Sequence, residues 1–176
     1  MSYAVAVGLL LSALMFHETG HWAALKRYRV DVREFWFGLG PMIARIGPLR
    51  VGLLPIGGAV VPHHESYRAL SARQRMHVAL AGPAASVVYG AALAVAALAG
   101  LDTPGMTGLL MLAGFNFFLA GLNILPVPPL DGFQALAAWR EMVGKPFAPR
   151  TLGWAFRLGN GVVYGVGFLL LFNIFF

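Results

Sequence analysis

Two histidines and a glutamate lie close together in the stretch "HETGH", inside an otherwise apolar segment. His17 and His21 are four residues apart, so on an α-helix they share one face and both imidazoles can reach a single metal ion. Glu18 lies beside that face, where it is placed to hold a water molecule rather than the metal. This division of labour is typical of metallopeptidases with the H-E-x-x-H pattern.

The apolar surroundings of this triplet favour a functional role. A strongly polar side chain inside a membrane-spanning helix costs on the order of a few kcal/mol unless it is used or paired. The alternative is a hydrogen-bonded cluster that only packs helices together. The chain has no cysteine, which excludes thiolate ligands and disulfides.

A catalytic zinc site normally takes three protein ligands, so a third must come from elsewhere in the chain. Asp131 stands out because it follows 28 uncharged residues and comes directly after a proline-rich break, "PVPPL". It is expected at the same depth as the histidines, in the inner third of the membrane. The alternative for Asp131 is a helix N-cap, a role compatible with ligation.

The elements that must position these residues are membrane helices. Of the 176 residues 59% are hydrophobic and 11% are charged, whereas a soluble domain carries roughly 25% charged residues. Uncharged runs supply the ~20 residues that cross a ~30 Å hydrocarbon layer. We expect a mainly α-helical, polytopic membrane protein, one membrane-embedded metalloprotease domain over residues 1–176. About four transmembrane helices are predicted, at about 3–25, 78–100, 106–125 and 154–176.

A membrane-associated β-hairpin is predicted between the first and second spans, over about 32–62. This region has no helical periodicity and is interrupted by glycine and proline every few residues. The segments "MIARI" and "LRVGLL" are expected to pair across a turn at Gly47 and Pro48. The region is so apolar that we expect part of it to enter the membrane against the helices.

The basic residues predict the orientation of the chain. Nine of the 13 lysines and arginines lie between residues 26 and 75, and the other four lie between 140 and 157. By the positive-inside rule, the regions 26–75 and 131–152 are cytoplasmic and both termini are outside. The rule accounts for the net charge of +6, so the lipid bilayer is the expected surroundings and no nucleic-acid partner is needed.

Two motifs resemble the paired signatures of the site-2 protease family of intramembrane zinc metalloproteases. "HETGH" matches that family's HExxH, and "NILPVPPLDG" matches NxxPxxPxDG. "AGPAAS" and "PIGGAV" are similar to accessory motifs of the family, so the likeness covers nearly the whole chain. Ser86 and Ala59 depart from the residues that are common there, and no PDZ or CBS domain is present to indicate how the protein is regulated.

The resemblance implies a function and a set of site residues. His17, His21 and Asp131 would bind one Zn²⁺ per chain, Glu18 would be the catalytic carboxylate, and Asn123 would help to position substrate. The substrate would be a membrane-anchored protein, cleaved in or near its transmembrane segment close to the cytoplasmic side, as in regulated intramembrane proteolysis. The implied location is the cell membrane of a prokaryote, as a multi-pass protein.

Other interpretations remain open at this point. A catalytically silent zinc-binding membrane scaffold of the same fold would not need Glu18 beside its histidines, and a metal transporter would carry polar residues in several spans. Asn123 is as well suited to capping broken helix carbonyls. His63 and His64 are candidates for a second metal site, although adjacent histidines at an interface are more often only exposed.

A hypothesis about substrate binding follows from the predicted hairpin. A peptide bond inside a helix must become extended before it can be cleaved. An unpaired strand edge within residues 42–54, held near the zinc, would add the unwound substrate as a further strand with little demand on its sequence. The glycines of "PIGGAV" would permit close backbone approach.

Overall fold

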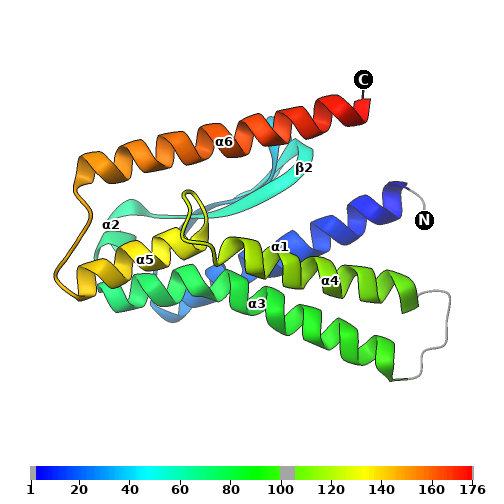
Figure 1. Cartoon of the computed structure of the whole chain (residues 1–176), viewed down its shortest axis with the longest axis horizontal. Coiled ribbons are helices and arrows are strands. Elements are labelled where there is room, and N and C mark those ends of the chain that lie inside the picture. Colours follow the sequence, from blue (N-terminus) through cyan, green and yellow to red (C-terminus); the bar gives the residue numbers. More distant parts are fainter. Residues whose placement is uncertain (1–2, 100–105, 176) are drawn as a thin grey trace.

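A computed structural model describes residues 3–99 and 106–175 of the chain. Six helices and a two-stranded antiparallel sheet form in these residues, and the strands come between the first two helices (Figure 1). The elements are α1 (Tyr3–Arg27), β1 (Val32–Ile46), β2 (Leu49–Pro62), α2 (His64–Arg68), α3 (Ala72–Leu98), α4 (Met106–Asn123), α5 (Asp131–Met142) and α6 (Pro149–Phe175). The mainly helical fold with an inserted hairpin is therefore confirmed.

Helix α3 is the centre of the assembly, because it contacts α1, α4 and α5. In Figure 1 the hairpin lies between α6 on one side and the other long helices on the other, and β2 contacts α1. Small residues bring α1 and α3 together: a Cβ at Gly20 would collide with the backbone of Ala81 and the side chain of Ala85. Close approach through small residues is the usual way in which membrane helices pack.

The second long helix begins earlier than the sequence analysis predicted. It starts at Ala72 instead of about 78, because Ser71 and Gln74 form a capping box that fixes its first turn. Arg73 and Arg75, which precede the predicted span, therefore belong to α3 itself. The connection between the second and third predicted spans, 101–105, lies outside the described residues.

The predicted turn at Gly47 and Pro48 is confirmed, since Ile46 pairs with Leu49 directly across it. The strands extend further than the two segments that were expected to pair. Residues 35–37 have partners on both sides: Phe35, for example, pairs with Leu49 and with Val60. Segment 35–37 is therefore central, whereas segments 42–46 and 58–60 lie at the two edges of the sheet.

An apolar surface covers the helices α3 and α4. Large side chains such as Val88, Val95, Met111 and Phe118 are 60–69% exposed. Exposure of this kind along adjoining helices marks contact with lipid or another protein. Within the described residues, α3 and α4 are long and apolar enough to cross a membrane.

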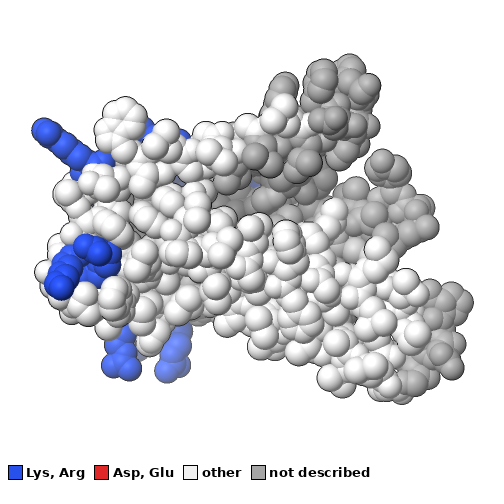
Figure 2. All heavy atoms as spheres, in the orientation of Figure 1, with Lys and Arg blue, Asp and Glu red and all other residues white. Residues whose placement is uncertain are grey.

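Charge is distributed unevenly along the molecule. On the face in Figure 2 the lysine and arginine side chains gather at one end, the end where Figure 1 places α2, α5 and the start of α6. The rest of the described surface on this face is uncharged. A basic end and an apolar body are the distribution that the positive-inside rule requires of a membrane protein.

Candidate metal centre and active site

Three predicted ligands from two distant helices meet at one point. The Nε2 atoms of His17 and His21 in α1 lie 3.3 Å apart. Asp131, the first residue of α5, places its Oδ2 atom 3.0 Å from Nε2 of His17 and 3.2 Å from Nε2 of His21. The structure thus brings together residues that are 114 positions apart in the sequence.

Asp131 is placed by the proline-rich turn after α4 and by the start of α5. The N-cap of α5 is Leu130, and no side chain caps this end. The suggestion that Asp131 also serves as the N-cap is therefore wrong: its carboxylate lies in the first turn and is directed at the histidines. Gly132 follows it against the carbonyl of Ile124, where a Cβ would collide. The chain therefore needs glycine directly after the aspartate.

The donor atoms fit a tetrahedral metal ion. Ligands about 2.0–2.1 Å from such an ion lie about 3.3 Å from one another, and the three separations here are 3.0, 3.2 and 3.3 Å. Two imidazole nitrogens and a carboxylate oxygen are a donor set that zinc accepts, with a fourth position left for water or substrate. Within the described residues, His17, His21 and Asp131 are the one group of at least three potential ligands at such spacing.

Helix α3 supports both histidines from behind. The Nδ1 atom of His21 lies 2.8 Å from the carbonyl oxygen of Val78, which can only accept, so this nitrogen carries the proton and Nε2 is free to bind metal. The Nδ1 atom of His17 lies 3.0 Å from Oγ of Ser86. Gly82 lies midway along α3 between these two residues, and a Cβ there would collide with the Nε2 atoms of both rings, so any side chain would fill the space beside the metal-binding nitrogens.

Glu18 is buried beside the ligand cluster and contacts the sheet. The backbone N–H of Val60 donates to its Oε2 atom over 3.1 Å. At Gly58 an added Cβ would lie 3.0 Å from Cγ of Glu18, so the strand approaches closely because it lacks a side chain there. Glu18 is 7% exposed, and its carboxylate lies where α1 meets the edge of the sheet.

The sequence model of peptidase family M50 matches residues 4–103, more than half of the chain. A candidate zinc metalloprotease of Methanocaldococcus jannaschii is 31% identical over 144 residues, which cover 79% of this chain and 70% of the relative. The chain belongs to peptidase family M50. The likeness to the site-2 proteases that was stated from the sequence motifs is thereby confirmed.

Two further comparisons extend this assignment. A zinc metalloprotease of the same organism is 26% identical over 137 residues, and the match spans 77% of this chain but only 34% of that relative. The solved structure of a site-2 protease from Methanocaldococcus jannaschii has the same fold, with a TM-score of 0.61 and 23% identity over 99% of this chain and 71% of that one. This member of family M50 therefore spans about a third of the length of the relative that is 26% identical to it.

Asn123 is not joined to the ligand cluster by any contact within the described residues. It is the last residue of α4, and its amide Nδ2 donates to the carbonyl of Leu119 over 3.0 Å. That donor serves the end of the helix, so its role in positioning substrate stays a prediction. His63 and His64 are both exposed at the start of α2, away from the cluster.

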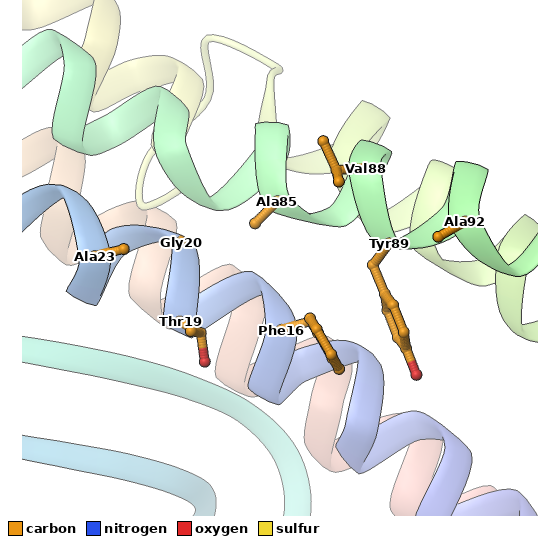
Figure 3. A pocket seen from close by; sticks show the side chains of 8 residues that line it. All are labelled: Phe16, Thr19, Gly20, Ala23, Ala85, Val88, Tyr89 and Ala92. Atoms are coloured by element: carbon orange, nitrogen blue, oxygen red, sulfur yellow. The ribbon is translucent and has the colours of Figure 1, made fainter.

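A separate groove of about 340 Å³ runs between α1 and α3. Figure 3 shows Phe16, Gly20 and Ala23 on one wall and Ala85 and Val88 on the other. Its lining is almost entirely apolar and lacks the three ligands and Glu18. The groove is therefore separate from the metal-ligand cluster of this family M50 member.

Sequence reasoning missed three of the contacts that complete the site: Ser86 with His17, Gly82 with both rings, and Val60 with Glu18. A signal for the first two was present. Gly82 and Ser86 are four residues apart in "AGPAAS", so they share one face of a helix, and that motif was noted only as an accessory likeness. For Val60 the sequence holds no comparable signal, because the contact is made by its backbone.

Proposed function

We propose that the chain is a membrane-embedded zinc endopeptidase that hydrolyses a peptide bond in or near the transmembrane segment of a membrane-anchored protein, close to the cytoplasmic side. The observation that carries the proposal is the position of Glu18, buried directly between a three-ligand metal site and an edge of the sheet. A purely structural metal site has no use for a carboxylate in that place.

Each residue of the site has a role in this chemistry. His17, His21 and Asp131 hold one zinc ion, which when bound lowers the pKa of a coordinated water and polarises the scissile carbonyl. Glu18 accepts the proton of the attacking water and later delivers it to the leaving amine. The backbone N–H of Val60 donates to its Oε2 atom and thereby orients the carboxylate.

The edge of β2 at residues 58–60 supports a model for substrate binding. The sequence favoured an edge within 42–54 as the place where substrate binds. The segment next to Glu18 is instead 58–60, because segment 42–46 forms the opposite edge of the sheet. In an antiparallel strand, the N–H and C=O of alternate residues point outward. Val60 directs its N–H at Glu18, so Gly58 presents its backbone groups on the same side. An extended substrate would pair there with its scissile bond next to Glu18.

The proposal includes a multi-pass topology, with α1, α3, α4 and α6 as spans and both termini outside. The basic end seen in Figure 2 supports a cytoplasmic position for α2, α5 and the start of α6. Asp131 opens α5, so the cluster lies toward that end and cleavage would occur near the cytoplasmic side. The cell membrane of a prokaryote is the proposed location, in keeping with relatives from Methanocaldococcus jannaschii.

The test uses the whole chain, purified and reconstituted into liposomes together with single-span reporter proteins. Each reporter carries a cytoplasmic fluorescent tag, and the set varies the position of a helix-destabilising glycine–proline pair along the span. We expect cleavage of reporters destabilised near the cytoplasmic end, loss of cleavage on chelation, and recovery with added zinc. Intact reporters throughout the set, with one zinc bound per chain, would contradict the proposal.

A further inference from the structure

Ser86 on α3 forms a hydrogen bond with His17, one of the three candidate metal ligands. Serine and threonine hydroxyls inside helices usually bond to a carbonyl of their own helix. Ser12 donates to the carbonyl of Leu9 over 2.7 Å, and Thr19 donates to that of Met15 over 2.7 Å. Ser86 does not follow this pattern: among the described residues, the hydroxyl has one hydrogen-bond partner, Nδ1 of His17, on another helix.

The burial of Ser86 keeps its contact with His17 away from water. The residue is completely buried, and His17 is 4% exposed, so water cannot replace the hydroxyl. The two helices are held close together nearby, because Gly20 lets α1 approach the backbone of Ala81, and Gly82 leaves room on α3 for both imidazoles. The imidazole of His17 therefore has a fixed partner on the side facing away from the metal.

We propose that Ser86 is a positioning residue that fixes the ring orientation of His17, so that Nε2 of this ring is directed at the metal ion. The inference rests on the proposed metalloprotease site and adds a residue to it. When the hydroxyl accepts from Nδ1–H, Nε2 has no proton and can bind the ion. Partners of this kind contribute roughly 10–100-fold to metal affinity.

The hydroxyl of Ser86, which contacts Nδ1 of His17, differs chemically from the carbonyl of Val78, which contacts Nδ1 of His21. The carbonyl of Val78 only accepts, so it permits a single tautomer of His21. A hydroxyl both accepts and donates. Before metal binds, Ser86 can donate to Nδ1 while Nε2–H of His17 donates to Asp131, 3.0 Å away. Ser86 thus satisfies His17 in both states, and the ligand that changes tautomer on metal binding is His17.

The experiment measures metal affinity and does not depend on proteolysis. Zinc binding by the purified full-length chain is titrated against a chelator of known affinity for the wild type, Ser86→Ala, Ser86→Thr and the control Ser12→Ala. We expect Ser86→Ala to bind zinc roughly 10–100-fold more weakly, Ser86→Thr to retain most of the affinity because it keeps the hydroxyl, and Ser12→Ala to match the wild type. Equal affinity of Ser86→Ala and the wild type would overturn the proposal.

A second readout separates positioning from a general loss of structure. With Co²⁺ as the probe, we expect Ser86→Ala to change the visible absorption bands that report ligand geometry, while its thermal unfolding without metal stays close to that of Ser12→Ala. An unchanged cobalt spectrum, or a weakened affinity that merely follows a lower melting temperature, would overturn the proposal. A wild type that binds zinc but cleaves no reporter would instead refute the proposed function, and leave the role of Ser86 standing.

Discussion

The helical side of the site and its sheet side are held by different kinds of contact. His17 and His21 are fixed by side-chain and backbone partners on α3, and no space remains around them at Gly82. On the sheet side, Glu18 contacts the backbone of Val60. Substitutions among the metal ligands should therefore change zinc binding, whereas substitutions along the strand edge should change turnover and leave zinc in place.

The largest effect is expected at Asp131. Asp131→Ala removes one of three ligands and should weaken zinc by more than the roughly 10–100-fold that an outer partner contributes. Metal analysis after dialysis against a chelator measures this loss. The matched control is Glu141→Ala, an exposed carboxylate of the same helix that pairs with Arg75. Undiminished zinc in Asp131→Ala would remove this residue from the ligand set.

Gly82→Ala tests how tightly the helical side is packed. The added methyl group collides with both imidazoles, so we expect a loss of about 1–3 kcal/mol of stability and weaker zinc binding. Gly114→Ala on α4 is the control, because nothing lies within 4 Å of its position and alanine favours a helix. Thermal unfolding measures the stability of both variants, and zinc titration measures their metal affinity. If Gly82→Ala behaves like Gly114→Ala, the rings are not confined as described.

Val60→Pro tests the sheet side. Proline deletes the N–H that donates to Glu18, a bond to a charged group that is worth about 1.5–3 kcal/mol. We expect cleavage to slow by about tenfold or more, with zinc content unchanged. The control is Ile43→Pro, because Ile43 is exposed and lies in segment 42–46, at the opposite edge of the sheet from Glu18. This variant should retain most of the activity. Loss of zinc in Val60→Pro would erase the distinction between the two sides of the site.

The smallest effect is expected at Glu34, which lies on the hairpin away from the metal ligands. Its carboxylate accepts from the indole of Trp36 over 2.8 Å and pairs with Arg50 at 2.6 Å. The Trp36 hydrogen bond, together with Arg50 and Arg33, lowers the pKa of Glu34 below its ordinary value of 4.5. The charged form is favoured in the folded state, so this contribution to stability is present above pH 4.5 and is lost as the pH falls below it.

Melting temperatures of the wild type and Glu34→Gln measured across pH 7 to 3 would detect this contribution. We expect the wild type to be more stable at neutral pH and the difference to narrow as the pH falls below 4.5. Glu65→Gln, an exposed control in α2, should show no such trend. A gap between the wild type and Glu34→Gln that stays constant with pH would contradict the assignment.

The sequence predicted those parts of the structure that depend on local pattern. The spacing of His17 and His21 fixes their common face, and the turn at Gly47 follows from residue types that allow a positive φ, here +58°. The early start of α3 was also readable, since Ser71 and Gln74 have the spacing of a capping box. These features need no knowledge of how distant segments pack.

The remaining features depend on packing between distant segments. Ser86 is 69 residues from His17, and Val60 is 42 residues from Glu18. Nothing in either local pattern says which partner will be met. The sequence predicted the pairing of 42–46 with 49–52, but it gave no sign that segment 35–37 also pairs with 58–60, which puts 58–60 instead of 42–54 beside Glu18. Only the assembled helices and strands determine these contacts.

Glu18→Gln separates metal binding from proton transfer, when zinc content and reporter cleavage are measured on the same preparation. The amide keeps the shape of the side chain and an oxygen that can accept from Val60, but it cannot take a proton from water. We expect one zinc per chain, as in the wild type, with cleavage abolished. Turnover near that of the wild type would make Glu18 a structural residue and contradict the mechanism.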